Sequence, residues 1–195
     1  MDIEFEATFS NVNKAIIRKI LKRAGAKLAR KEYLQKRVVF NLPKGHEING
    51  GWLRVRDEGN KITMSLKVVD GDKIENQKET QLTIDSFDEA VSLLNSVGCT
   101  KKAYQESKRE LWKLDSADIT LDEWPFLEPF IEIEGKSEQV VKDVSKKLGF
   151  DYKDALFCAV DKLYNLKYGI PEDTINNCTP EILFNNDNPF LKRFA

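Results

Sequence analysis

The sequence predicts an α+β domain built on a largely antiparallel β-sheet, and three observations support this prediction. Strand-like segments follow one another in runs with helical segments between the runs, whereas a doubly wound parallel sheet would alternate strand and helix. The strand-like segments alternate apolar and polar residues, which is the period of a half-buried strand. No linker rich in Gly, Ser or Pro divides the 195 residues. We therefore expect a single domain over 1–195, with a C-terminal tail over 171–195.

The first half of the chain begins with a strand and a helix. Residues Ile3–Phe9 alternate strictly between apolar and polar side chains, as a strand does. Asn11 or Asn13 can cap a helix over Lys14–Ala24, and a glycine follows its last residue. The turn Glu58-Gly59-Asn60 indicates a hairpin between the two strands on either side of it. The strands expected after the helix are, in chain order, Tyr33–Leu42, Trp52–Arg56, Lys61–Val69 and Lys78–Ile84.

The second half contains helices with recognisable caps. Ser86 and Glu89 form a capping box, which opens the first of these helices. Ser137 caps a second helix, which extends to Lys147, and a third is expected over Tyr152–Tyr168. The tail is rich in Asn and Pro and is expected to be loop or extended coil. The strands expected between the first and second helices are Tyr104–Leu114, Ile119–Glu123 and Phe130–Glu134.

The composition argues against several classes of function. With 31 basic and 32 acidic side chains the formal net charge is −1, which disfavours a nucleic-acid coat or a membrane-surface protein. No run of 18 apolar residues and no signal peptide is visible, so we expect a cytoplasmic protein with no membrane and no nucleic-acid partner.

The three cysteines are widely spaced and His46 is the one histidine, so neither a zinc site nor a histidine-based triad is expected. No glycine-rich nucleotide loop is present, so any chemistry must come from carboxylates, lysines and arginines.

The charges on the polar faces of the predicted strands come in pairs of one sign. Members of a pair are two residues apart, so they share a strand face about 7 Å from one another. A solvated sheet face explains any one pair, but a sheet closed into a barrel would point all of them inward. Arginine and lysine bind phosphate oxygens and carboxylates bind Mg²⁺ or Mn²⁺, so such an interior would suit a polyphosphate and a metal. The pairs are Glu4 and Glu6, Arg54 and Arg56, and Glu132 and Glu134, and single charges follow at Lys67, Lys78, Arg109 and Asp122.

Several of these segments, taken in chain order, are similar to the motifs of one known family. Glu4-Phe5-Glu6-Ala7-Thr8 resembles an E-x-E-x-K signature, and Trp52-Leu53-Arg54-Val55-Arg56 resembles an L-R-x-R strand. The remaining matches are Lys67, Lys78-Glu79, Lys108-Arg109-Glu110, Leu121-Asp122-Glu123 and Phe130-Ile131-Glu132-Ile133-Glu134. Together they resemble the CYTH superfamily of class IV adenylyl cyclases and thiamine triphosphatases, also called triphosphate tunnel metalloenzymes, over roughly residues 3–164. This resemblance implies a closed eight-stranded antiparallel β-barrel with helices packed outside.

The resemblance also implies roles for the charged residues. The expected substrate is a small-molecule triphosphate, and the expected state is a monomer or a homodimer. The triphosphate would be bound by Arg54, Arg56, Lys67, Lys78 and Arg109. One or two Mg²⁺ or Mn²⁺ ions would be bound by Glu4, Glu6, Asp122, Glu132 and Glu134. The residues expected to take part in catalysis are Glu4, Glu6, Arg54, Arg56, Lys67, Arg109, Glu132 and Glu134.

Two residues depart from the family's pattern. Thr8 stands at the last position of the E-x-E-x-K signature, and Ser107 stands two residues before Arg109, where a lysine is common. Each change removes one cation from the phosphate site and would cost about 1.5–3 kcal/mol of charge-assisted hydrogen bonding. The expected function is a triphosphatase that acts on inorganic, nucleoside or thiamine triphosphate. The alternatives are a class IV adenylyl cyclase, which makes cyclic AMP and pyrophosphate from ATP, and a catalytically weakened protein that binds a nucleotide or a polyphosphate.

Overall fold

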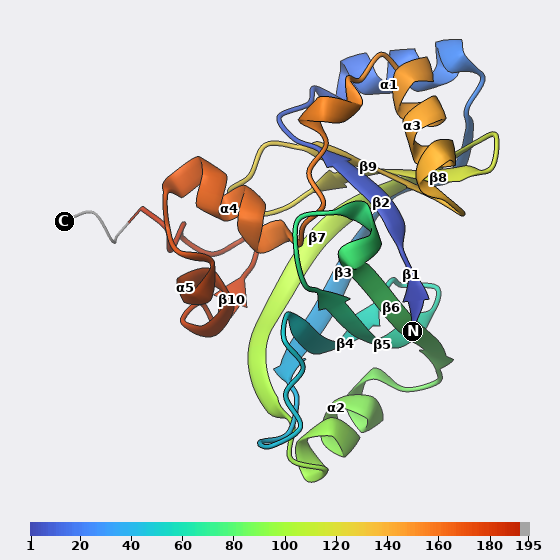
Figure 1. The fold of residues 1–195 in the computed structure, drawn as a ribbon. Helices are drawn as coiled ribbons and strands as arrows, with labels where there is room; N and C mark the ends of the chain where they lie inside the picture. The colour runs from blue at the N-terminus through green and yellow to red at the C-terminus, as the bar shows by residue number, and fades with distance from the viewer. Residues whose placement is uncertain (192–195) are drawn as a thin grey trace.

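One antiparallel sheet, curled into a barrel, organises the chain, and the structure, a computed structural model, describes residues 1–191. Its strands are hydrogen-bonded in the order β1-β6-β5-β4-β3-β7-β8-β9-β2. Their bounds are β1 (Asp2–Ile3), β2 (Phe5–Phe9), β3 (Lys27–Asn41), β4 (Gly51–Asp57), β5 (Ile62–Val69), β6 (Gln77–Ile84), β7 (Thr100–Leu114), β8 (Ala117–Glu123) and β9 (Phe130–Gly135). β1 and β2 are the two halves of one strand, which is interrupted at Glu4. Because β1 pairs with β6 and β2 pairs with β9, the sheet closes into the eight-stranded barrel that was predicted (Figure 1).

The two longest strands, β3 and β7, bend around the barrel. They pair with each other antiparallel, and their register shifts at three points. Such irregularities bend a strand and increase its twist, which helps a sheet to close. Figure 1 shows β7 as one long curved ribbon along the side of the barrel. Both strands begin earlier than predicted, since the sequence indicated only Tyr33–Leu42 and Tyr104–Leu114.

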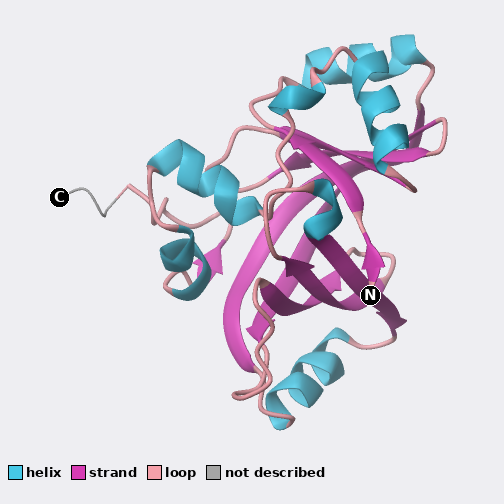
Figure 2. Cartoon of the chain, viewed as in Figure 1, coloured by secondary structure: helices cyan, strands magenta, loops and turns pink. Residues whose placement is uncertain are grey.

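Helices cover the outside of the barrel in three places (Figures 1 and 2). α1 (Lys14–Ala24) and α3 (Glu138–Lys147) lie together at one end, next to β2, β8 and β9, and α2 (Phe87–Ser96) lies at the opposite end. α4 (Val160–Tyr168), α5 (Glu172–Asn177) and the short strand β10 (Glu181–Ile182) form a third group, in which β10 pairs parallel with β7. Within residues 1–191, no helix is long and apolar enough to cross a membrane.

The predicted helix caps form. The Asn13 side chain accepts hydrogen bonds from the backbone N–H groups of the first turn of α1, and Gly25 ends that helix with a left-handed φ of 87°. Ser86 accepts from the backbone N–H of Glu89 at the start of α2. Ser137 accepts from the third residue of α3 in the same manner. These three helices therefore begin at the predicted residues.

The apolar cores lie between the barrel and its helices. Leu21 of α1 and Val141 of α3 pack in one buried cluster with Ile133 of β9. A second cluster joins α2 to β3 and β4, and a third joins α4, α5 and β10 to the chain around β9. Because the apolar side chains of each strand face these helices, the alternate side chains face the interior. The polar face of the strands is thus the inside of the barrel.

The predicted helix over Tyr152–Tyr168 is wrong in its first half. Only a short 3₁₀ turn forms at Tyr152–Asp154, the next residues are not helical, and α4 begins at Val160. The cause is a tertiary contact, since the backbone N–H and C=O of Leu156 both bond to the backbone of Thr8, at 2.9 Å each. This pairing draws the segment over residues 155–159 against β2, and a helix could not form the same bonds.

Two smaller predictions also need correction. The tail is not simply loop or coil, because α5 and β10 form within it and Phe190 is buried against Tyr164. Residues 192–195 lie outside the described part of the chain. The predicted strand Ile3–Phe9 is broken at Glu4. Before the break the chain pairs with β6, and after it the chain pairs with β9. That break is the point at which the barrel closes.

Candidate functional site

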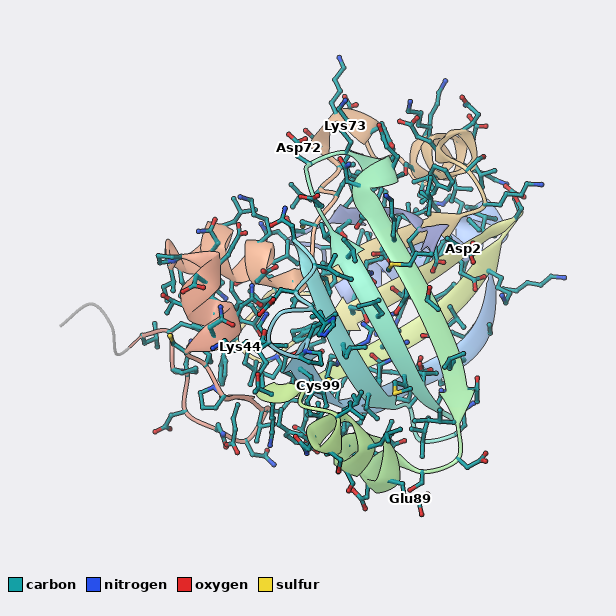
Figure 3. All side chains as sticks on the ribbon, turned by 60° about the horizontal axis from the view of Figure 1, so that its bottom comes forward. Asp2, Lys44, Asp72, Lys73, Glu89 and Cys99 are labelled. Carbon is teal, nitrogen blue, oxygen red and sulfur yellow. The ribbon has the colours of Figure 1, made fainter. Side chains whose placement is uncertain are left out.

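The barrel encloses a cavity of about 1000 Å³ that is lined by many charged side chains. Residues from every strand from β2 to β9 contribute, and so do Glu4 and the segment 155–162, which runs along one side. Figure 3 places Asp72, which also lines the cavity, at the opposite end of the barrel from Glu89 of α2. The distribution of the two signs of charge within this cavity determines what it can bind.

Three arginines form what we call the cationic wall: Arg37 on β3 and Arg54 and Arg56 on β4. Arg37 lies directly opposite Arg56 in the register of the two strands. Arg54 and Arg56 face inward because Val55, between them, is fully buried in the outer cluster with α2. Burial and then repulsion by Arg54 lower the pKa of Arg56 to about 10. Like charges directly opposite each other are unfavourable, so this wall needs anions to compensate it.

Two members of the cationic wall each have one carboxylate partner. Arg54 donates to Glu79 of β6 at 2.8 Å, and Arg56 forms an ion pair with Glu58 at 2.8 Å. Burial opposes ionisation of Glu79, but the neighbouring Arg54 prevails and lowers the pKa of this carboxyl to about 2. These pairs use only part of each guanidinium. The Nε atoms of Arg37, Arg54 and Arg56 are all buried, and none has a hydrogen-bond partner among residues 1–191.

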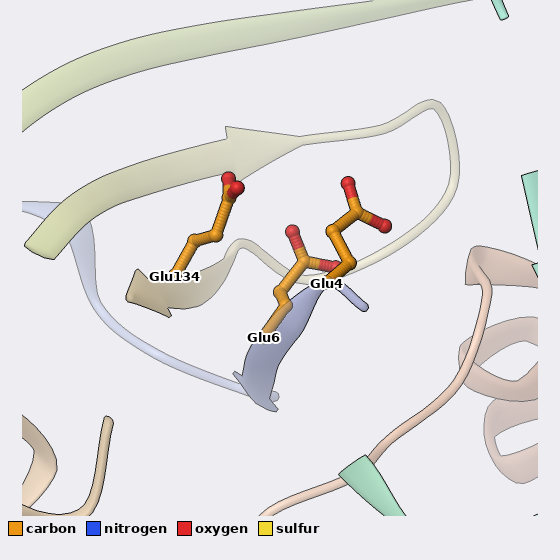
Figure 4. A group of neighbouring side chains, drawn as sticks. All are labelled: Glu4, Glu6 and Glu134. Atoms are coloured by element: carbon orange, nitrogen blue, oxygen red, sulfur yellow. The ribbon is translucent and has the colours of Figure 1, made fainter. Parts of the chain in front are cut away.

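Three glutamates form a second group, which we call the carboxylate cluster: Glu4, Glu6 and Glu134 (Figure 4). Glu6 of β2 lies opposite Glu134 of β9, and Glu4 stands at the break between β1 and β2. One oxygen of each carboxylate lies within 4.8 Å of the other two. Burial raises the pKa values of Glu4 and Glu6 to about 7, although Lys67 opposes the shift in both. Such a cluster favours a bound cation.

Lys67 of β5 and Arg109 of β7 lie against carboxylates inside the barrel. The Lys67 ammonium is 2.6 Å from Glu4 and 3.7 Å from Glu6. Arg109 donates from Nε and Nη2 to the two oxygens of Asp122, at 2.7 and 2.9 Å, and from Nη2 to Glu132. Burial opposes the charge of Arg109, but these two carboxylates prevail and raise its pKa. Both cations are therefore already compensated within the protein.

Most of the predicted site residues line one cavity, but two do not lie where they were expected. Lys78 is exposed on the outer face of β6, and its neighbour Glu79 faces the cavity in its place. Asp122 is fully buried and bonds Arg109 and Thr120 instead of joining the carboxylate cluster. Glu132 does line the cavity, where burial, and next repulsion from Glu6, raise its pKa to about 8.

The two positions that depart from the family's pattern are both buried. The backbone of Thr8 pairs with Leu156, as described above, and its side chain adds no charge to the cavity. The Ser107 hydroxyl donates to Gln35 and accepts a hydrogen bond from Arg37. Lys108, the residue after Ser107, pairs with Glu123 outside the cavity, as strand alternation predicts.

Sequence reasoning missed several residues of the site, of which Arg37 is the most informative. A signal was present, because Tyr33, Gln35 and Arg37 alternate along a predicted strand and would share one face.

Glu58 was read as part of a turn, yet it is buried beside Arg56. Lys78 was predicted to bind substrate and its neighbour Glu79 was not. Only the pairing of Lys67 with Glu79 across β5 and β6 shows which of the two faces inward.

The fold and the charged interior of the barrel together define a tunnel-like β-barrel, in which the cationic wall and the carboxylate cluster share one cavity. The CYTH domain model matches residues 3–163, and the chain belongs to the CYTH family. Members of this family bind small-molecule triphosphates and are usually triphosphatases or adenylyl cyclases. No curated protein sequence gives a significant match.

Solved structures confirm the fold. The PH1012 protein of Pyrococcus horikoshii OT3 is 23% identical and gives a TM-score of 0.67 over 82% of this chain and 98% of that one. A putative adenylate cyclase of Vibrio parahaemolyticus is 13% identical, with a TM-score of 0.71 over 84% and 98%. A putative adenylyl cyclase of Hippeastrum, described as having a dominant triphosphatase activity, is 15% identical, with a TM-score of 0.56 over 87% and 99%.

Proposed function

We propose that this protein is a metal-dependent triphosphatase that binds its substrate inside the barrel. The observation that carries the proposal is the set of buried arginine Nε atoms in the cationic wall, which have no partner among residues 1–191. A buried N–H group without a partner is costly, and on a guanidinium it is best satisfied by a carboxylate or a phosphate. The carboxylates of residues 1–191 leave these atoms without a partner, so an anionic ligand is the natural partner.

The cations would bind the phosphate chain in different ways. Arg54 and Arg56 would donate directly to phosphate oxygens, because each has a carboxylate partner and, within residues 1–191, an Nε without one. Lys67 and Arg109 are compensated by carboxylates, so they would hold phosphate as members of a mixed-charge network. Positive charge placed where negative charge accumulates during phosphoryl transfer lowers the barrier for the reaction.

The carboxylate cluster fits a hard divalent cation such as Mg²⁺ or Mn²⁺. Glu4, Glu6 and Glu134 offer three carboxylate oxygens close together, and such oxygens are the usual ligands of these ions. Enzymes of the CYTH family generally depend on a divalent metal. When bound, the ion would supply positive charge that offsets both the three glutamates and the phosphates.

The proposed reaction is hydrolysis of the terminal phosphate. The oxygen of a water molecule attacks the terminal phosphorus, the bond to the bridging oxygen breaks, and the diphosphate part leaves with the bonding electrons. One proton of the water passes to a carboxylate of the cavity and then to solvent. The arginines would hold the chain in line for this attack, and a glutamate would orient the water. This reaction requires no adenosine pocket, whereas a cyclase must also place the ribose 3′-hydroxyl against the α-phosphorus.

A substrate panel tests the proposal. Inorganic triphosphate, ATP, GTP and thiamine triphosphate would each be supplied with Mg²⁺ or Mn²⁺, and phosphate, pyrophosphate and cyclic AMP would be measured. The proposal predicts release of phosphate, with loss of activity when the metal is chelated. Release of pyrophosphate and cyclic AMP from ATP would instead identify an adenylyl cyclase. If no triphosphate binds or reacts while the protein is folded, the proposal is wrong.

A second candidate function is a triphosphate-binding protein with weakened catalysis, and the position of Thr8 favours it. Thr8 is buried, carries no charge and pairs through its backbone with Leu156. The discriminating variant is Thr8→Lys, which adds a cation without removing the backbone pairing. If the wild type binds triphosphate without turnover and the variant hydrolyses it, the binding function gains support. Rapid turnover by the wild type would exclude it.

A further inference from the structure

Arg37 differs from every other arginine of the cavity in its surroundings. It is 5% exposed, and among residues 1–191 it forms no ion pair with a carboxylate. Arg54 and Arg56 each form one such pair, and Arg109 forms two. Burial, followed by repulsion from Arg56, Arg54 and Arg109, lowers its pKa well below the usual value. A buried charge without a counter-charge destabilises a protein, so the presence of this one calls for an explanation.

Neutral groups hold Arg37 in place. Its Nη2 donates to the Gln35 side chain at 2.9 Å and to the Ser107 hydroxyl. Its guanidinium lies over the Trp124 ring, 4.4 Å from the ring centroid. These contacts orient the group but do not neutralise it. The Nε of Arg37 is buried without a partner in the described part of the chain, and Arg37 lines the cavity.

The position of Arg37 within the barrel indicates what would neutralise it. β3 lies between β7, which carries Arg109, and β4, which carries Arg54 and Arg56. With Lys67 on β5, the cations then occupy four adjacent strands without a gap. A chain of phosphates carries negative charge at each phosphorus, so it matches a continuous row of cations better than a single anion does.

We propose that Arg37 is a substrate-binding residue, which donates to a phosphate oxygen of the bound triphosphate and fills the place on β3 between Arg109 and the β4 arginines. This inference rests on the proposed function and names a residue that the family's motifs did not indicate. It also assigns a purpose to Gln35 and Ser107, which hold the guanidinium in position. The expected base is absent at residue 107, and the cation of this region comes from the neighbouring strand.

The test compares Arg37→Gln with Lys36→Gln, a matched control on the exposed face of the same strand. Glutamine at residue 37 retains hydrogen-bonding groups but removes the charge. We expect Arg37→Gln to weaken the binding of inorganic triphosphate about 10-fold to 100-fold, which is the usual loss for one charge-assisted hydrogen bond. The melting temperature without ligand should stay the same or rise, because an uncompensated buried charge has been removed. Lys36→Gln should change neither quantity.

A double variant guards against the possibility that the single variant loses affinity only because it misfolds. Arg37→Gln combined with Ser107→Lys moves the cation from β3 to β7, opposite Gln35, and should recover much of the lost affinity. If Arg37→Gln lowers the melting temperature and binds triphosphate as tightly as the wild type, Arg37 has a structural role and this inference alone is wrong. A wild type that binds no triphosphate would overturn the proposed function and this inference with it.

Discussion

The two charged regions of the barrel interior differ in how their charges are compensated. In the cationic wall, among residues 1–191, each β4 arginine has a single carboxylate partner and Arg37 has none, so positive charge is in excess. In the carboxylate cluster, the ammonium of Lys67 lies against Glu4 and Glu6, and Glu134 adds a third carboxylate, so negative charge is in excess. A phosphate chain would compensate the first region and a divalent cation the second. Each region thus lacks what a metal–triphosphate complex would bring.

Asp122 and Arg109 give a reference for a charge that is already compensated. Because Asp122 is fully buried and bonds Arg109 through both oxygens, Asp122→Asn should leave the arginine without its main partner. Breaking a buried ion pair costs about 3–5 kcal/mol, so this variant should lower the free energy of unfolding by about that amount. Denaturation with urea measures the change. An Asp122→Asn protein as stable as the wild type would show that compensation of buried charge does not govern stability in this barrel.

The next largest effect is expected at Arg54. Arg54→Gln removes one phosphate-binding guanidinium and should reduce kcat/KM for the preferred triphosphate about 100-fold. It also leaves Glu79 without its partner, so the stability of the single variant will fall as well. The double variant Arg54→Gln/Glu79→Gln separates the two effects. It should recover stability but not activity, and recovery of both would mean that Arg54 acts only through the fold.

Metal dependence should change in the carboxylate cluster. Glu6→Gln removes one of three oxygen ligands and should raise the Mg²⁺ concentration needed for half-maximal activity at least about 10-fold. Without metal, the variant should melt at a higher temperature than the wild type. Neutral glutamine removes a charge that burial, and next repulsion from Glu4 and Glu134, make unfavourable despite the attraction of Lys67. A Mg²⁺ titration of the activity checks the first statement, and calorimetric unfolding without metal checks the second. An unchanged Mg²⁺ requirement would place the metal elsewhere.

The smallest effect is expected at Lys78. Since this side chain lies on the outer face of β6, Lys78→Gln should change kcat/KM by less than about twofold. Glu79→Gln is the matched variant on the inner face, and it should lower activity because Arg54 loses its partner. Equal effects of the two variants would contradict the assignment of inner and outer faces on this strand.

The predictions from sequence succeeded where local signals determine the structure. The caps at Asn13, Ser86 and Ser137 and the alternation along the strands depend on residues that are neighbours in the chain. The helix predicted over residues 152–168 failed because Leu156 pairs with Thr8, almost 150 residues away, and no local pattern records that pairing. Helical propensity is a weak preference that such tertiary contacts override.

The charged pairs show the same limit within the site. Spacing of two residues correctly predicted that Arg54 and Arg56 share a face, as do Glu4 and Glu6. It could not decide whether Lys78 or Glu79 faces inward, because that depends on register with β5. Nor could it show that Arg37 has no carboxylate partner in the described part of the chain, since ion pairs form between strands that are distant in sequence. Compensation of charge is a property of the folded barrel alone.

The most direct test of this account is a crystal structure of the complex with Mn²⁺ and a non-hydrolysable inorganic triphosphate analogue. The account predicts phosphate oxygens about 3 Å from the Nε atoms of Arg37, Arg54 and Arg56. It also predicts an anomalous manganese peak between Glu4, Glu6 and Glu134. An analogue bound outside the barrel, or bound inside it away from the arginine Nε atoms, would contradict the claim that the two charged regions form one triphosphate site.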